Sequence, residues 1–266
     1  MLSQLADFAG AVVNIDLLSE WGYRLVRGLG VTAEVVILSC TIGFLLAYPI
    51  ARARMSRFWL LSAPAVGYVT FFRGTPLLCQ LYLAYYGAGE LRPFLTEVDL
   101  WWFFRDAFYC CIFAFSLNTA AYQSEIMRGA IMSVPKGQLE AAHALGLSRY
   151  ATARHIVWPQ AMLVALRPFG NELIGMIKAS ALAAIVTLLD LMGETRFVFA
   201  RTFDFSIYVY CALIYLAMTQ AISRVWNWLE RGLSRHLLAG QPAALVLAPA
   251  GRKGQGAALD PVGAGH

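Results

Sequence analysis

The sequence predicts an all-α integral membrane protein with about five transmembrane helices. Of its 266 residues, 59% are hydrophobic and only 14% are charged, whereas soluble domains carry roughly 25% charged residues. The apolar residues are also gathered into five long stretches, each on the scale of the ~20 residues that a membrane-spanning helix needs. Because so little polar surface cannot cover a water-soluble globule, we expect lipid to solvate part of the chain.

The five apolar stretches comprise residues 31–51, 58–89, 107–124, 161–189 and 205–223. The second is longer than one span requires but short for two spans and a loop. The fourth is interrupted by polar residues and a proline, namely Arg167, Pro168, Asn171, Glu172 and Lys178. We therefore expect five helices, of which the second and the fourth are irregular.

Basic residues are divided unequally between the segments that connect these stretches. The segments after the first, third and fifth stretches hold ten lysines and arginines near the span ends, and those on the other side hold six. Positively charged segments are retained in the cytoplasm. The distribution predicts an external N-terminus and a cytoplasmic C-terminus. The mild net charge of +5 fits such loops, so we expect no nucleic-acid partner.

The cytoplasmic segment 133–159 predicts two short helices joined at a glycine. Pro135 suits the start of the first helix, and Gly146 can end it in a left-handed turn. Ser148 can cap a second helix, and Pro159 limits how far that helix continues. The prediction is a helical hairpin between two membrane spans.

Six residues of this segment form a spaced motif: Glu140, Ala141, Ala142, Gly146, Ile156 and Pro159. Their spacing resembles the EAA loop of ABC importer permeases, E-A-A-x3-G-x9-I-x-L-P, with Trp158 where the family usually has leucine. In that family the loop docks into a groove on the ATP-binding subunit. The resemblance implies that these six residues couple the chain to an ATPase; the alternative is a surface hairpin with an incidental Glu-Ala-Ala.

Three further segments resemble the polar amino acid permeases, the histidine/glutamine/arginine group. They are the Phe-Arg-Gly-Thr-Pro-Leu-Leu run at 72–78 and the segments 117–131 and 171–182. Three shorter runs, at 192–193, 201–204 and 228–231, look most like permeases for arginine and for opines such as octopine. The resemblance implies a type I ABC importer permease that moves polar or basic amino acids across the bacterial inner membrane.

The resemblance also implies a domain organisation and partners. Residues 1–28 would be an N-terminal periplasmic segment and 29–238 the transmembrane domain with its coupling loop 133–159. The tail 239–266, rich in Ala, Gly and Pro, is predicted to be disordered in the cytoplasm. The expected partners are ABC ATPase subunits, a periplasmic amino-acid-binding protein, a second permease chain (the same or homologous) and membrane lipid.

Catalysis and cofactors are not expected in this chain. It has no phosphate-binding G-x-x-x-x-G-K-[ST] loop, so ATP would be bound by the partner subunit. The five cysteines lie in apolar stretches without a C-x-x-C pair, which predicts buried thiols with no disulfide and no metal site.

Polar residues at membrane depth are candidates for the substrate path, because charges there usually face the bundle interior. The candidates are Arg73, Thr75, Asn118, Tyr122, Glu125, Asn171, Glu172 and Lys178. Glu125 and Glu172 could accept a cationic substrate or instead bond neighbouring helices. Arg73 could line the path or pair with either glutamate, and Lys178 could meet a substrate carboxylate or pair with Glu172.

The alternative function is an ion-coupled secondary transporter or channel for small polar solutes. Internal repeats would favour it, and the sequence shows none. A membrane enzyme would need a polar cluster with acid–base or metal-ligand spacing, which is likewise not evident in the sequence.

Overall fold

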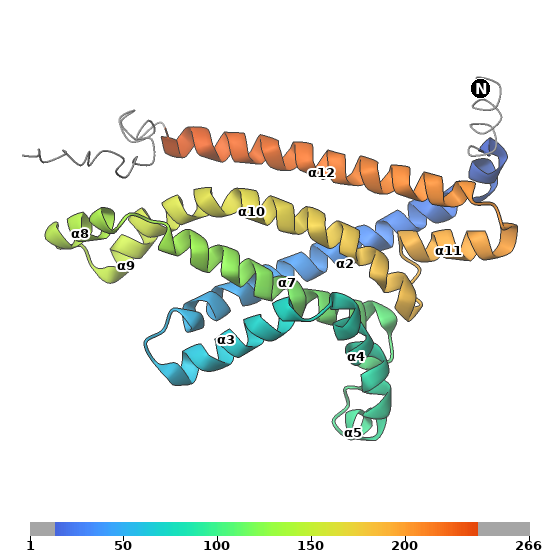
Figure 1. Ribbon diagram of the computed structural model, residues 1–266, viewed down its shortest axis with the longest axis horizontal. Coiled ribbons are helices and arrows are strands. Elements are labelled where there is room, and N and C mark those ends of the chain that lie inside the picture. The colour runs from blue at the N-terminus through green and yellow to red at the C-terminus, as the bar shows by residue number, and fades with distance from the viewer. Residues whose placement is uncertain (1–13, 239–266) are drawn as a thin grey trace, which may run out of the picture.

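The computed structural model describes residues 14–238, and every regular element in that range is a helix. Five helices run along the long axis of the molecule, and successive ones reverse direction (Figure 1). They are α2 (Ile15–Arg54), α3 (Trp59–Gly74), α7 (Ala107–Met132), α10 (Trp158–Ala179) and α12 (Ser206–Leu238). The predicted all-α class is confirmed.

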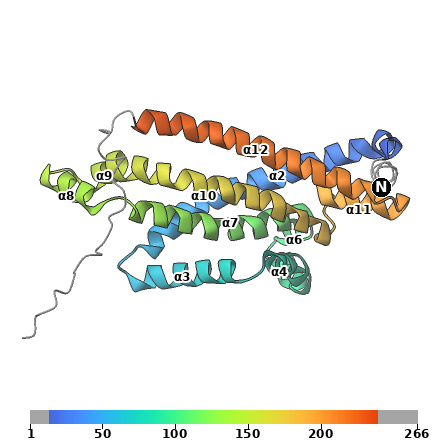
Figure 2. The ribbon, with the colours of Figure 1, turned by 45° about the horizontal axis from the view of Figure 1, so that its top comes forward.

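Shorter helices connect the long ones: α4 (Leu77–Glu90), α5 (Arg92–Glu97), α6 (Trp101–Phe104), α8 (Lys136–Ala144), α9 (Arg149–Thr152), the π-helix η1 (Ala153–Val157), the 3-10 helix η2 (Ser180–Val186) and α11 (Leu191–Thr202). The α2–α3 connection, the α8–α9 hairpin and the end of α12 lie at one end of the bundle, and α11 lies at the other with the start of α2 (Figures 1 and 2). The three basic segments therefore share one end of the molecule, as their charge predicted.

Three helical stretches of the described chain are long and apolar enough to cross a membrane: Asp16–Arg54, Arg149–Val186 and Ser206–Leu233. The predicted third span, α7, is more polar because protein rather than lipid surrounds much of it. It packs against α2, α3, α4 and α10, and its buried residues include Asn118, Thr119 and Gln123. These side chains find hydrogen-bond partners inside the bundle, which lowers the cost of placing them there.

The first helix begins well before the predicted span at Val31. Asn14 caps it, because its side-chain oxygen accepts a 3.3 Å hydrogen bond from the Leu17 amide. Residues 15–28 of the expected N-terminal segment are therefore helical and continuous with the span. Residues 1–13 and the tail 239–266 lie outside the described residues, so the expected disorder of the tail stays a prediction.

The second apolar stretch is broken at Thr75–Pro76, which confirms its predicted irregularity. Pro76 has no amide hydrogen to continue the helix, and Thr75 before it is extended, with φ −111° and ψ 147°. The chain changes direction here, so that α4 leaves the line of α3 (Figure 1). The break places a loop beside α7, where a continuous helix would have presented only side chains.

The expectation that Pro159 limits the second helix of the hairpin is wrong. Helical structure runs without a gap from Arg149 to Val186, through α9, η1, α10 and η2. Pro159 lies in the first turn of α10, just after the π-helix η1. The wider π turn leaves room for a ring that would clash with the carbonyl four residues earlier. Within the fourth stretch, residues 161–189, the irregularity is the 3-10 helix η2, whereas the π-helix η1 precedes the stretch.

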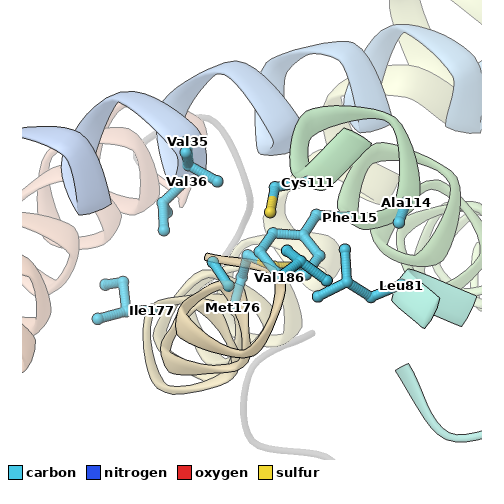
Figure 3. Close-up of a cluster of buried hydrophobic side chains, with 10 residues drawn as sticks. Val35, Val36, Leu81, Cys111, Ala114, Phe115, Met176, Ile177 and Val186 are labelled. Carbon is cyan, nitrogen blue, oxygen red and sulfur yellow. The ribbon is translucent and has the colours of Figure 1, made fainter. Parts of the chain in front are cut away.

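The main core joins α2, α4, α7, α10 and η2. Figure 3 shows the ring of Phe115 among Leu81, Met176 and Val186, and all four side chains are buried. Helices α2 and α7 approach closely at Gly43, where an added Cβ would lie 2.3 Å from Thr119 Cγ2. Position 43 therefore needs glycine to keep the two backbones at this distance.

The cysteines do not all follow the expectation of burial. Cys110, Cys111 and Cys211 are buried and Cys40 is partly buried, but Cys79 is exposed on α4. The expectation is wrong for Cys79, because its side of α4 also exposes Tyr82 and Leu83 and so forms an apolar outer surface instead of a core.

Candidate functional site

A cavity of about 310 Å³ lies where the α3–α4 break meets α7 and α10. Its lining is Thr75, Pro76, Leu77, Asn118, Tyr122, Glu172, Gly175, Met176 and Ala179. Half of the eight candidate path residues thus line one cavity, although they come from three separate segments of the sequence. The cavity combines apolar walls with a few polar groups, as small-molecule sites usually do.

Two buried amides hold the break in place. Gln80 Nε2 donates to the carbonyl oxygens of Phe72 (2.9 Å) and Thr75 (3.1 Å) and to Thr75 Oγ1 (2.8 Å). Asn118 Nδ2 donates to Phe72 O (3.1 Å) and to Gln80 Oε1 (2.9 Å). The carbonyls released by the break are therefore satisfied by protein side chains, and the amide group of Asn118 is engaged in positioning the cavity wall.

Sequence reasoning missed Gln80. The signal was present, since Gln80 is a polar residue in an apolar run, four positions after Pro76. Its partners are backbone atoms at the break, which no side-chain pattern reveals.

Glu172 contributes an acidic group to the cavity. Thr119 Oγ1 donates a 3.0 Å hydrogen bond to Glu172 Oε1, and Gln123 Nε2 donates a 3.1 Å bond to Thr119 Oγ1. Among the described residues, no lysine or arginine forms an ion pair with Glu172. The carboxylate is oriented by a neutral donor and keeps the capacity to accept a cation.

Glu125 is surrounded by arginines. It forms ion pairs with Arg54 and Arg128, whose Nε lies 3.2 Å from Glu125 Oε1, and Arg73 Nη1 lies 4.0 Å from Glu125 Oε2. We call these four residues the Glu125 cluster. Of the two glutamates that were candidate partners for Arg73, Glu125 is the one within ion-pair distance, at its 4.0 Å limit. A carboxylate with three cationic neighbours attracts a further cation weakly.

Asn171 and Lys178 lie away from this cavity, toward α12. Asn171 lines a space of about 330 Å³ with Arg167, Trp226 and others. Lys178 lines one of about 310 Å³ with Tyr215 and its neighbours. The proposed Lys178–Glu172 ion pair is not formed in the described chain. The structure therefore divides the candidate path residues between two sides of α10.

The α8–α9 hairpin turns at Gly146, which has φ +71°. The Leu147 amide donates to Ala142 O and the Gly146 amide donates to His143 O, both at 3.0 Å. This pair of bonds is the Schellman pattern that closes a helix at a left-handed glycine. Ser148 Oγ then accepts a 3.2 Å bond from the Ala151 amide, so the predicted glycine turn and serine cap are both confirmed.

The hairpin projects past the ends of α7 and α10 (Figures 1 and 2). Ala142 is 1% exposed and packs inside, whereas Glu140 and Ala141 are on the surface. Leu145 and Tyr150 are 78% and 77% exposed. Ile156 and Pro159 belong to η1 and the start of α10, at the root of the hairpin. Exposed apolar side chains at the tip of a rigid knob suit a protein-docking surface.

A family model for the binding-protein-dependent transport system inner membrane component matches residues 39–235. The chain belongs to this family. The matched range includes both the cavity and the hairpin, so the two features sit within a membrane permease component.

Named relatives agree with this family. The permease is 39% identical over 228 residues to the nopaline transport system permease protein NocM of Agrobacterium fabrum, covering 85% of this chain and 95% of that protein. It is 39% identical over 210 residues to the octopine transport system permease protein OccM of Rhizobium meliloti, covering 79% and 85%.

A solved structure extends the agreement to the fold. The crystal structure of an amino acid ABC transporter with histidines matches with a TM-score of 0.73 and 32% identity, over 82% of this permease and 98% of that chain. The fold is therefore that of a type I ABC importer permease.

Proposed function

We propose that this permease is the non-catalytic membrane subunit of an ATP-driven importer for basic amino acids or their opine derivatives. The cavity carries the proposal, because it offers one carboxylate, Glu172, that forms no ion pair with a lysine or arginine of the described residues. A cationic group that leaves water needs such an acceptor. The transport of nopaline and octopine by the systems of its relatives supports the same substrate class.

ATP binding and hydrolysis belong to a partner subunit in this proposal, and the permease holds no cofactor. The hairpin is the docking element. Its exposed Leu145 and Tyr150 would enter the partner, while the Schellman turn at Gly146 keeps the knob rigid. A rigid knob continuous with α10 through α9 and η1 can pass a movement of the ATPase directly into a helix that lines the cavity.

A second permease chain, the same or homologous, would complete the path. Asn171 and Lys178 are exposed on α10 and spaced seven residues apart, on one face. Charged groups at membrane depth are costly unless protein or water faces them. A partner chain, or a water-filled path shared with it, would remove Lys178 from lipid. A periplasmic binding protein would deliver the substrate to the opposite end of the bundle.

The orientation follows from charge. The bundle end that holds the three basic segments, one of which is the hairpin, would face the cytoplasm. Residues 1–28 would then lie on the periplasmic side and the tail 239–266 in the cytoplasm. A reporter active only in the cytoplasm, fused after Leu238, should be active. Activity of a periplasmic reporter at the same position would reverse the orientation and would move the hairpin away from any cytoplasmic ATPase.

Affinity purification tests the docking directly. The permease is co-expressed with its ATP-binding subunit, and Leu145→Asp should abolish copurification because it places a charge in the apolar contact. Val98→Asp, a matched change at an exposed position (46%) in the α5–α6 connection, should leave it intact. Equal copurification by both variants would contradict the docking role of the hairpin.

A further inference from the structure

Arg73 lies at the edge of the cavity that Thr75, Tyr122 and Glu172 line. It is the second-to-last residue of α3, two positions before Thr75, which lines the cavity. Its guanidinium lies 5.3 Å from the ring centroid of Tyr122, another lining residue. Its side chain is 42% exposed. The group is thus held beside the cavity by a cation–π contact, with part of its surface open.

The Glu125 cluster does not satisfy Arg73. Three arginines share a single carboxylate, so the cluster carries an excess of two positive charges. Arg54 and Arg128 form the close contacts, and Arg73 is the most distant at 4.0 Å. A guanidinium has five N–H donors, and a contact at 4.0 Å is too long for a hydrogen bond. Arg54 also has an unpaired donor, Nε, but that atom is buried. Arg73 is the most exposed arginine of the cluster, so its spare donors can reach a ligand.

The cavity walls favour an anion near Arg73. The carbonyl oxygens of Phe72 and Thr75, which would repel a carboxylate, already accept hydrogen bonds from Gln80 and Asn118. The start of α4, at Leu77, lines the same wall, and the positive end of its helix dipole adds to the field of Arg73. Glu172 lines the cavity and Arg73 lies against the lining residue Tyr122, so the site has an anionic and a cationic side.

The geometry points to a carboxylate subsite in which Arg73 binds a carboxylate of the transported molecule while Glu172 accepts its cationic group. The inference rests on the proposed function and requires both groups in the transported molecule. Basic amino acids satisfy this requirement, and opines, which are N-carboxyalkyl amino acids, satisfy it with an additional carboxylate. Amides and decarboxylated analogues would lack the partner of Arg73.

Binding of acid and amide pairs tests the subsite. The purified permease–ATPase complex, without the binding protein, is titrated calorimetrically with arginine and argininamide, with octopine, and with glutamine and glutaminamide, in which the α-carboxylate is replaced by an amide. The wild-type complex should prefer arginine to argininamide by about tenfold or more, the ratio typical of one charge-assisted hydrogen bond. Arg73→Gln should bring this ratio close to one, and Arg73→Lys should retain part of it because it keeps the charge.

Arg52→Gln is the matched control. Arg52 is exposed on α2 and forms no ion pair within the described chain, so the acid-to-amide ratio should be unchanged. An unchanged ratio in Arg73→Gln, with a melting temperature like that of the wild type, would overturn the subsite.

The two hypotheses fail in different ways. Binding of glutamine but of neither arginine nor octopine would refute the proposed basic substrates, and loss of discrimination between glutamine and glutaminamide in Arg73→Gln would still support the subsite. Absence of binding by every carboxylate in the panel would refute both.

Discussion

The hydroxyl of Thr119 on α7 donates a 3.0 Å hydrogen bond to Oε1 of Glu172 on α10. The bond joins the two central helices at the cavity wall and fixes the carboxylate without neutralising it. Glu125, in contrast, is neutralised by arginines. The two acidic residues that look equivalent in the sequence therefore have different roles, and each role can be tested.

Glu172→Gln should reduce uptake of a cationic substrate by about tenfold or more, because the variant keeps an acceptor for Thr119 but loses the charge. The measurement is radiolabelled uptake into proteoliposomes, with the melting temperature of each variant recorded. Glu97→Gln is the control, since Glu97 is exposed on α5 and forms no ion pair within the described chain, and it should change uptake less than twofold. Uptake by Glu172→Gln at the wild-type rate would remove Glu172 from the path.

Glu125→Gln should act on stability. It leaves Arg54, Arg73 and Arg128 close together without a counter-charge, and removing one partner of a mostly buried ion pair costs on the order of 2 kcal/mol. The melting temperature and purification yield of the complex should fall. A normal melting temperature combined with lost uptake would show that Glu125 contacts the substrate instead.

Gly146→Pro should uncouple transport. Proline fixes φ near −65° and cannot adopt the +71° of this turn, so the hairpin is strained by ~1–3 kcal/mol and its tip is misplaced. Substrate-stimulated ATP hydrolysis should be lost while membrane insertion continues. Gly146→Asn is the control, because asparagine tolerates left-handed backbone and should retain most of the stimulation. Normal stimulation in the proline variant would contradict the coupling role.

Stability should depend on pH through Asp190, which caps α11 by accepting a 2.9 Å bond from the Gly193 amide. Burial raises the pKa of the Asp190 carboxyl to about 6, against the opposing effect of that bond. Because the folded-state pKa lies above the unfolded one, the stabilising contribution of the protonated form is present at low pH. It is lost as the pH rises through about 6.

Asp190→Asn, which cannot ionise, should therefore flatten the decline in melting temperature between about pH 4 and pH 6 and be more stable at pH 8, on the order of 2 kcal/mol. Identical pH profiles for the two proteins would show that Asp190 does not titrate in this range.

The long helices and the hairpin were predictable because they depend on local chemistry. Apolar runs define the spans, and Gly146 and Ser148 mark their own turn and cap. The continuous helix through Pro159 could not be predicted from the sequence, because the formation of a π-helix before a proline depends on how the widened turn packs. The early start of α2 was also not predictable from the apolar runs, because Asp16 and Glu20 are charged although both lie on the helix that Asn14 caps.

The candidate site was predictable in part. Thr75, Asn118, Tyr122 and Glu172 could be chosen as polar residues at membrane depth, and they line one cavity. The separation of Lys178 from Glu172 could not be foreseen, since α10 directs them to different neighbours. The role of Gln80 in holding the break could not be foreseen either, because its hydrogen-bond partners are backbone carbonyls exposed by the break.

The central claim, that this permease works in an ATP-driven importer for basic substrates, is tested most directly by uptake into proteoliposomes. These contain the permease, its ATP-binding subunit and the binding protein, with ATP or ADP enclosed and with or without an imposed proton or sodium gradient. The account predicts uptake of arginine or octopine that requires both ATP and the binding protein and does not depend on the imposed gradient. Uptake driven by the gradient with ADP enclosed would contradict it and would identify an ion-coupled secondary transporter.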